Sequence, residues 1–361
     1  MRITEREIIQ HLQRAGDQYA PLTINRFEEQ VLLPQGYRID AIIEFSIQDG
    51  PSFEALVEIT PVSTPKNIIE KSRQLADCLG EIVRSDIVPL LIAPYIGTKQ
   101  AKILADKGIS WIDLSGNMSI RVSNQIYIER TGRRNRFPDT APIKKIFQGT
   151  SSLVSRALLL KPEGFSSLYE VVDFINDRDA SITKSTVSKV LKSLEEELLI
   201  NKSKSLISVT NREKLLEKLT EGYLSSTERK SRETYRFAAE STKKLFYGLF
   251  EKQIDYLACG FYAAQIKGLA VTDQITIFVK DIEQVKKASM WNWVKITPDS
   301  EFGNVSITET KDPGVWFNAP LLMYDAVVDN IELYLEMMTD TPRGPKIAKL
   351  IKQRILTGDA G

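Results

Sequence analysis

The chain has 361 residues with almost balanced charge, since 48 Lys and Arg stand against 47 Asp and Glu. This length allows two or three domains with cores of their own, and the balance excludes a strong overall field that would attract nucleic acid. The composition, 42% apolar and 26% charged, is ordinary for a globular protein in water. No apolar run approaches about 18 residues. The sequence therefore predicts no membrane span, and the lack of a signal-peptide apolar region at its start favours the cytoplasm.

The charge is unevenly distributed along the chain. Residues 131–240 contain 20 basic and 15 acidic side chains, whereas residues 1–130 contain 14 and 17. The middle third is thus locally basic, which is where a nucleic-acid contact is expected.

Cysteine and histidine limit the chemistry that is available. Cys78 and Cys259 are far apart in sequence, and His11 is the only histidine. The sequence therefore predicts no disulfide framework and no zinc site of the usual type, which fits a reducing compartment. We expect His11, on the polar side of the first helix, to have no catalytic role. Any metal would be oxygen-ligated, as Mg²⁺ and Mn²⁺ are.

The first elements in chain order are two helices and two strands. Residues 3–14 predict a helix with Thr4 as N-cap and Glu7 completing a capping box. Residues 22–33, LTINRFEEQVLL, predict a second helix with exposed glutamates. The segment 38–60 predicts two strands joined by a Gly-Pro turn.

The next elements alternate between helix and strand. Residues 64–83 have helical apolar spacing, and residues 86–96 form a short apolar run typical of a buried strand. Residues 98–108 predict a helix closed by Gly108, and residues 109–129 predict further strands. We therefore expect residues 1–135 to form a mixed α/β domain with one central sheet.

A basic linker follows the first domain. It contains Arg133, Arg134 and Arg136 together with two prolines and two lysines. Two interpretations stay open, a solvated charge run and an arm that contacts the DNA backbone.

Residues 136–222 have the order of elements of a winged helix-turn-helix domain. Helices are predicted at 151–162, 167–176 and 183–200, followed by a short hairpin at 201–210 and another helix. Thr183 fits an N-cap position. The third helix has an apolar stripe at helical spacing, formed by Val187, Val190, Leu191, Leu194 and Leu198.

The opposite side of this third helix is suited to DNA. Small hydroxyl side chains and lysines can reach major-groove edges and adjacent phosphates. The candidate DNA-binding residues are Thr183, Lys184, Ser185, Thr186, Ser188, Lys189 and Lys192, with Lys202 and Lys204 on the wing. A winged helix that makes only protein contacts is the alternative.

Residues 223–361 predict a third, α/β domain. A helix and strand fall within 256–281, and short strands are expected at 290–298, 304–310 and 315–320. Two final helices are divided at Pro342–Pro345. The tryptophans of this block, Trp291, Trp293 and Trp316, are expected in its core or at an interface, which makes it the preferred surface for a homodimer.

The order of these blocks resembles the AbiEi-like antitoxins of type IV toxin–antitoxin systems and related transcriptional regulators. The similar stretches are LLIAPYIGTKQAKILADKGISWIDLSGNMSIRV, SITKSTVSKVLKSLEEELLI with ISVTNREKLLEKL, and IELYLEMMTDTPRGPKIAKLI. The resemblance implies a cytoplasmic regulator whose winged helix binds an operator in double-stranded DNA. It also implies a partner toxin that is similar to a nucleotidyltransferase.

The first block separately resembles the PD-(D/E)XK nuclease-like fold. Asp40 and Glu58 match its two acidic strand positions, and Gln74 matches a glutamine on the following helix. Such nucleases hold Mg²⁺ between the carboxylates and use a nearby lysine to stabilise charge on the attacked phosphate. Thr60 stands where that lysine is expected. Lys66 or Lys71 could approach from the next helix, and a strand-end pair without metal is the alternative.

The last block distantly resembles a nucleotidyltransferase core. Gly260 to Ala264 begin a helix where a Gly-Ser pair would stand, but of the paired metal-binding aspartates only Asp273 is found. We expect partner binding or dimerisation from this block and no catalysis.

Three hypotheses follow for the whole α+β, multidomain chain. The favoured one is a DNA-binding transcriptional regulator with an inactive nuclease-like domain, which needs no cofactor and leaves plasmid, linear and single-stranded DNA intact with Mg²⁺ or Mn²⁺. The second is a magnesium-dependent DNA endonuclease that its winged helix directs to a target. The third is a non-catalytic module that binds and neutralises a toxin.

Overall fold

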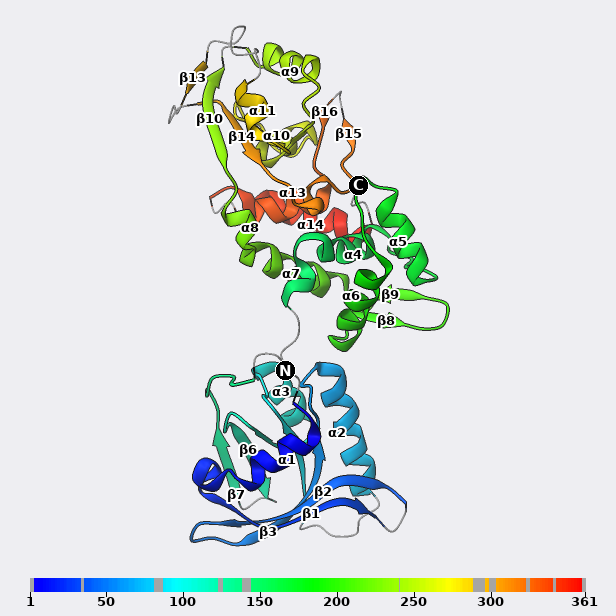
Figure 1. Cartoon of the computed structure of the whole chain (residues 1–361), viewed down its shortest axis with the longest axis vertical. Coiled ribbons are helices and arrows are strands. Elements are labelled where there is room, and N and C mark those ends of the chain that lie inside the picture. The colour runs from blue at the N-terminus through cyan, green and yellow to red at the C-terminus, as the bar shows by residue number, and fades with distance from the viewer. Residues whose placement is uncertain are drawn as a thin grey trace. The chain divides into compact units, whose positions relative to one another are not determined.

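The protein is an α+β chain that divides into two compact units, formed mainly by residues 1–143 and 144–361. Figure 1 shows the elements of each unit. No helix in the part of the chain that the structure describes is both long and apolar enough to cross a membrane. The computed structural model describes residues 3–33, 36–80, 87–122, 126–137, 144–239, 241–287, 296–298, 303–322, 325–339 and 342–358.

The first unit is built on a seven-stranded sheet whose strands follow one another in chain order. The first three strands form an antiparallel meander, the central three are parallel and joined by helices, and the last two pair antiparallel. A helix is the usual connection between parallel neighbours. The strands are β1 (Leu22–Leu32), β2 (Arg38–Ile47), β3 (Ser52–Ile59), β4 (Ile87–Ala93), β5 (Ser110–Asp113), β6 (Met118–Val122) and β7 (Ile126–Arg130).

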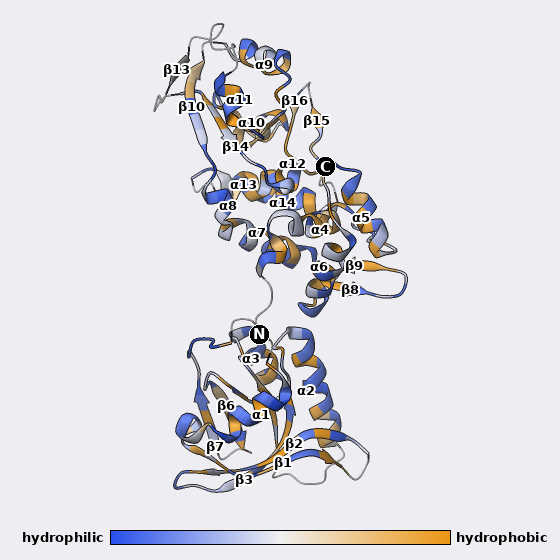
Figure 2. Cartoon of the chain, in the orientation of Figure 1, coloured by the Kyte–Doolittle hydropathy of each residue, from blue (hydrophilic) through white to orange (hydrophobic). Residues whose placement is uncertain are grey.

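Helices cover both faces of this sheet. On one face, α1 (Glu5–Gln13) buries Ile8 and Leu12 against the strands. On the other face, α2 (Pro65–Gly80) and α3 (Thr98–Asp106) pack through Ile68, Leu75 and Leu104. Figure 2 shows the alternation of apolar and polar residues along these elements. The Thr4 capping box is present as predicted, and a short 3-10 helix, η1 (Gly16–Tyr19), leads into β1.

The predicted helix at residues 22–33 is wrong, because this segment forms strand β1. It pairs with β2 from Leu22 opposite Ile47 to Leu32 opposite Arg38, with a bulge between Ile24 and Arg26. The bulge inserts one residue into the alternation of the strand. The extra residue shifts the apolar positions after the bulge relative to those before it. The apolar residues of this segment are therefore three and four positions apart, as they are in a helix.

The second unit begins with helices and a small hairpin. A single apolar core joins these helices to the C-terminal helices and includes Leu153, Val190, Leu215, Ile331 and Ile351. The elements are η3 (Lys144–Phe147), α4 (Gly149–Leu160), α5 (Leu168–Asn176), α6 (Lys184–Glu196), β8 (Ile200–Lys202), β9 (Ile207–Val209), α7 (Arg212–Ser225) and α8 (Thr227–Lys230). Leu198 does not extend the apolar stripe of α6, because it lies beyond the end of the helix, exposed and at φ 57°.

The remainder of this unit contains a five-stranded sheet in the order β11-β12-β14-β10-β13, and a two-stranded ribbon of β15 and β16. Its strands are β10 (Thr234–Ala239), β11 (Tyr256–Ala258), β12 (Ile275–Val279), β13 (Ile296–Pro298), β14 (Val305–Glu309), β15 (Leu321–Leu322) and β16 (Asp325–Ala326). Its helices are α9 (Thr242–Glu251), α10 (Gly260–Ile266), α11 (Ile282–Lys287), α12 (Pro313–Trp316), α13 (Asn330–Met337) and α14 (Gly344–Thr357).

The strand predicted at 315–320 is also wrong, because the short helix α12 covers its first residues. The Asp312 side chain accepts a hydrogen bond from the amide of Gly314 at 2.9 Å, and Pro313 occupies the first turn. A carboxylate cap followed by proline is a start signal for a helix. The predicted tryptophans Trp291 and Trp293 lie outside the described residues, and Trp316 is half-buried.

A buried ion pair connects two distant helices of the second unit. The guanidinium of Arg156 on α4 lies 2.5 Å from Glu332 on α13, and the two side chains are 3% and 0% exposed. The hydroxyl of Tyr223 on α7 donates to the other oxygen of Glu332 at 3.1 Å. Three helices are thereby fixed to one carboxylate in a dry interior, where breaking such a pair is strongly destabilising.

Gly164 tests the packing of the hairpin against the helices that precede it. It has φ +85°, and a Cβ there would lie 2.4 Å from the carbonyl oxygen of Ile207. We expect Gly164→Ala to lower the free energy of unfolding by about 3 kcal/mol, because strain and a backbone collision add. Urea unfolding measures this loss.

The matched control is Gly149→Ala, also at positive φ (+50°) but with nothing within 4 Å of its Cβ. It should cost about 1 kcal/mol, from backbone strain alone. Equal losses in the two variants would contradict the close approach at Ile207.

Candidate active site and nucleic-acid interface

Two acidic side chains meet on neighbouring strands of the first unit. Ala41 on β2 is paired with Val57 on β3, so Asp40 and Glu58 follow at adjacent positions. Side chains alternate along a strand, and both carboxylates therefore face the side of the sheet that α2 covers. The amide of Ile59 donates to Asp40 Oδ2 at 2.8 Å, which fixes this carboxylate against β3.

Lys71 brings a positive charge to this pair from α2. Its ammonium lies 3.1 Å from Asp40 Oδ2 and 2.5 Å from Glu58 Oε2. The exposed fractions of the side chains are 23% for Lys71, 16% for Asp40 and 3% for Glu58, so the three charges form a cluster that is largely shielded from water. We call these three residues the DEK cluster.

The other predicted residues of this site lie around the cluster. Thr60 is buried, and its hydroxyl donates to the carbonyl of Val62 at 2.8 Å, which turns the chain after β3. Lys66 is half-buried in the first turn of α2. Gln74 is exposed on α2 and makes no hydrogen bond within the described residues. Of the two candidate lysines, Lys71 is therefore the one that contacts the acidic pair.

Burial sets the protonation of the cluster. It raises the pKa of Glu58 to about 7, against the opposing effect of the Lys71 ammonium. The pKa of Lys71 is raised, because the attraction of both carboxylates outweighs its burial. Glu5, on α1, has a raised pKa through burial and then through the charge of Asp40. Glu5 thus belongs to the same electrostatic neighbourhood, although the sequence pattern did not identify it.

The two carboxylates could accept a hard cation. Oxygens of Asp40 and Glu58 converge on one position, and Mg²⁺ is commonly held by one or two carboxylates with water completing its shell. The Lys71 ammonium contacts the same oxygens, so a divalent ion would have to displace it. Among the described residues, no group of three or more His, Cys, Asp and Glu side chains is arranged for a metal. The oxygens of Asp40 and Glu58 therefore fit a metal site with two carboxylate ligands.

A second set of predicted residues gathers on α6 in the second unit. Thr183 caps this helix, since its hydroxyl accepts from the amide of Thr186 at 3.3 Å. The hydroxyls of Ser185 and Thr186 lie 3.1 and 3.0 Å from the Thr183 hydroxyl. The exposed side chains on this helix and its cap are Thr183, Lys184, Ser185, Ser188, Lys189 and Lys192, whereas Thr186 is half-buried.

The hairpin of β8 and β9 extends this polar surface. Lys202 and Lys204 are exposed on it. Across the portion of the chain that the structure covers, neither they nor Lys189 and Lys192 form an ion pair. We call the exposed residues of α6 and the hairpin the α6–wing surface. Its ammonium groups are available to an anionic partner.

Tyr169 on α5 lies beside this surface, and the sequence pattern missed it. It is 59% exposed. The Lys184 ammonium lies 4.2 Å from the centre of its ring and donates to its hydroxyl. An exposed aromatic residue beside a predicted recognition helix was the available signal. The pair orients Lys184 across the surface.

The three arginines of the predicted linker belong to the first unit. The backbone amide of Arg133 donates to the Asn117 side chain at 2.8 Å, and that of Arg136 donates to Ser115 at 3.2 Å. All three side chains, including that of Arg134, are exposed. Residues 138–143 of the predicted linker lie outside the described residues.

The nucleotidyltransferase-like positions form no acidic site in the described part of the chain. Gly260 begins α10 and donates its amide to Glu336 at 3.1 Å, and Ala264 is buried. Asp273 is exposed before β12. His11, at the end of α1, packs edge-on against Phe137 with the ring centres 5.9 Å apart. Both cysteines are free and buried.

No protein-family model matches this sequence, and no curated protein matches it. A solved structure of EndoMS in its apo form is similar over 31% of this chain and 46% of that chain, with 13% identity and a TM-score of 0.23. The matched region is less than half of EndoMS, and a likeness this weak supports no conclusion about activity. The site geometry is therefore the basis for assigning a function.

Replacing Lys71 tests the DEK cluster. We expect Lys71→Met to lower the free energy of unfolding by about 3 kcal/mol at pH 8, because two shielded carboxylates lose their counter-charge. The folded-state pKa of Glu58, already above its ordinary value, should rise further without the ammonium. A raised carboxyl pKa costs stability as pH rises, so the loss should be smaller at pH 5, where Glu58 is protonated. Urea unfolding at both pH values measures this.

Lys99→Met is the control for this change. Lys99 is exposed on α3 and forms no ion pair in the described residues, so its replacement should alter stability by less than about 0.5 kcal/mol. If both variants unfold alike at pH 8, Lys71 does not neutralise the acidic pair.

Proposed function

We propose that this protein binds double-stranded DNA through its second unit and acts as a transcriptional regulator. Helices α4, α5 and α6 followed by the β8–β9 hairpin have the element order of a winged helix-turn-helix, in which α6 is the recognition helix. The proposal agrees with the function that the resemblance to AbiEi-like antitoxins implies.

The observation that carries the proposal is the α6–wing surface. It combines cations that have no carboxylate partner among the described residues, namely Lys189, Lys192, Lys202 and Lys204, with exposed hydroxyls at the start of a helix. Cations and helix N-termini are the usual contacts to phosphate oxygens. The first residues of a recognition helix are those that reach base edges in the major groove. The helix is held in place by its buried side, Val187, Val190, Leu191 and Leu194.

Removing three lysines of α6 tests this function. We expect the variant with Lys184, Lys189 and Lys192 replaced by alanine to lose specific binding to the DNA upstream of its own gene. For every phosphate that is no longer neutralised, the slope of log K against log salt should fall by about 0.9. Fluorescence anisotropy over a range of salt concentrations measures both quantities.

The control variant carries alanine at Lys243, Lys244 and Lys252, which are exposed on or next to α9 and form no ion pair among the described residues. It loses the same charge at a different surface, so its DNA affinity and salt slope should stay close to those of the unchanged protein. Equal losses in both variants would mean that total charge, and not the α6–wing surface, governs binding.

A second candidate function, a metal-dependent DNA endonuclease, is favoured by one observation, the contact of Lys71 with both carboxylates. Thr60 stands where nucleases of the PD-(D/E)XK type carry a lysine. The ammonium of Lys71 reaches the acidic pair from the next helix. A lysine supplied from α2 would therefore provide the positive charge that Thr60 lacks.

The chain's own groups have definable tasks in that candidate function. Asp40 and Glu58 would hold Mg²⁺ or Mn²⁺, and such an ion supplies Lewis acidity for hydrolysis of a phosphodiester. Lys71, displaced from the carboxylates, would be placed to stabilise negative charge that develops on the phosphate. A Glu58 pKa near 7 allows this carboxyl to exchange a proton near neutral pH.

A cleavage assay separates the two functions. The endonuclease candidate predicts cutting of plasmid or linear DNA with Mg²⁺ or Mn²⁺ that is lost in both Asp40→Asn and Lys71→Met. The regulator alone predicts intact DNA with every variant and with the unchanged protein. Cutting that persists in Asp40→Asn would identify a contaminating nuclease and remove the DEK cluster from consideration.

The homodimer and the nucleotidyltransferase-like toxin belong to the regulator proposal. Two winged helices would read two half-sites about one turn of DNA apart, and a dimer supplies them. The C-terminal elements from α9 to α14 are the surface that we assign to such partners.

A further inference from the structure

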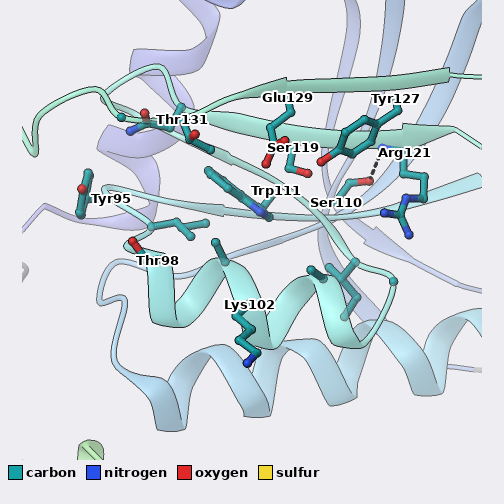
Figure 3. Close-up of a pocket in the computed structure, with 17 residues that line it drawn as sticks. Tyr95, Thr98, Lys102, Ser110, Trp111, Ser119, Arg121, Tyr127, Glu129 and Thr131 are labelled. Atoms are coloured by element: carbon teal, nitrogen blue, oxygen red, sulfur yellow. Dashed lines mark hydrogen bonds between the residues drawn. The ribbon is translucent and has the colours of Figure 1, made fainter.

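The first unit contains an open pocket on the side of the sheet away from α1. It has a volume of about 530 Å³ and lies between α3 and the strands β5, β6 and β7. Figure 3 shows its walls, with α3 on one side and the polar side chains of β6 and β7 on the other. The residues of the DEK cluster do not line it. A pocket of this size accommodates a small organic ligand.

The pocket exists because neither wall fills it. Helix α3 presents Ala101 and Ala105 to the space, and Gly108 follows at its end. On β6, Met118 and Ile120 are buried in the core beneath α1, so the alternate residues, Ser119 and Arg121, face the pocket. The small side chains of α3 therefore leave the polar face of β6 and β7 uncovered.

Trp111 supplies a polar group that the fold leaves without a partner. It is 3% exposed, lines the pocket from β5, and its indole N–H donates to no acceptor in the described residues. Figure 3 shows its ring between the β6–β7 strands and α3. The indole nitrogen is not fully buried, although most of the side chain is, so its N–H is open to the pocket. A ligand acceptor would satisfy this donor while its ring packed against the indole.

A cation on β6 favours an anion. Arg121 lines the pocket and forms no ion pair within the described ranges, whereas the Lys102 side chain extends from α3 away from the strands (Figure 3). The Arg121 guanidinium lies 5.5 Å from the centre of the exposed Tyr127 ring. The backbone amide of Arg121 donates to Ser110 at 3.0 Å, which fixes β6 against β5. Glu129 is the one carboxylate among the lining residues, and it is available to accept from an amino group.

We propose that this pocket binds an anionic ligand with a planar aromatic ring, of the size and chemistry of a nucleoside monophosphate. The ring lies between Trp111 and Tyr127, with an acceptor toward the indole N–H. The phosphate lies toward Arg121. The inference is independent of the DNA-binding proposal, since none of these residues belongs to the α6–wing surface or to the DEK cluster.

The test is isothermal titration calorimetry of the full chain with AMP, GMP, CMP and UMP. At least one should bind saturably at a single site, and ribose 5-phosphate should bind about tenfold more weakly, because it lacks the ring. A single-stranded oligodeoxynucleotide is titrated in parallel, so that a free nucleotide and a nucleotide within a strand are distinguished. Saturable binding of any of these nucleotides that disappears when the pocket is filled supports the proposal.

Two variants locate the binding. Ala105→Phe fills the pocket from the exposed face of α3 and should abolish it. Arg121→Gln should weaken it about tenfold through the missing charge, whereas Lys99→Gln, on α3 outside the pocket, should leave it unchanged. The comparison of Arg121→Gln with Lys99→Gln decides between the outcomes if Ala105→Phe does not fold.

The proposal is overturned if no mononucleotide and no oligonucleotide binds saturably. It is also overturned if ribose 5-phosphate binds as tightly as AMP, or if Arg121→Gln and Lys99→Gln have equal effects.

Discussion

The first unit depends on one cation placed between two carboxylates that are nearly out of water. Without the Lys71 ammonium, Asp40 and Glu58 would repel each other across adjacent strands, and burial would drive one of them to take up a proton. Because the ammonium comes from α2, the same contact fixes which side of this helix faces the sheet. The cluster is consequently both a structural tie between three elements and the arrangement from which hydrolytic chemistry would start. A substitution in the DEK cluster would therefore change the stability of the fold and the candidate chemistry together.

The sequence identified both carboxylates of the DEK cluster, but it did not show which lysine contacts them. Asp40 and Glu58 are recognisable because they lie on adjacent predicted strands, near the start of the first and at the end of the second, and Lys66 and Lys71 were both candidates. The apolar spacing of α2 distinguishes the two lysines, since Lys71 and Ser72 occupy the turn between the buried Ile68 and Leu75. A charged residue on the apolar side of a helix needs a partner inside. Glu5 was out of reach, because only tertiary packing brings α1 toward the cluster. The pocket beside α3 is likewise a product of three separate segments.

Most helices and strands follow from periodicity, and the two errors have local causes. In β1 a bulge produces helical spacing in a strand, so the pattern of apolar residues misleads without knowledge of the pairing with β2. In α12 the apolar residues suggest a strand, but the Asp312–Pro313 start signal determines the backbone of so short a segment. The α6 helix shows the opposite case. Its cap, its buried stripe up to Leu194 and its exposed lysines agree with one another, and the prediction of its exposed face from sequence alone was correspondingly detailed.

The ion pair between Arg156 and Glu332 has a practical consequence for dividing the chain. A shortened protein that ends at residue 222 would retain Arg156 but would lack Glu332, which pairs with it, and Tyr223, which donates to the same carboxylate. It would also expose the apolar residues that α4 shares with the C-terminal helices, such as Leu153 and Leu158. A buried guanidinium without its counter-ion and a newly exposed apolar face both promote aggregation. The fragment that can be isolated for binding studies is therefore the whole of residues 144–361, in which the helices that would touch DNA and those that would touch a partner fold as one cooperative body.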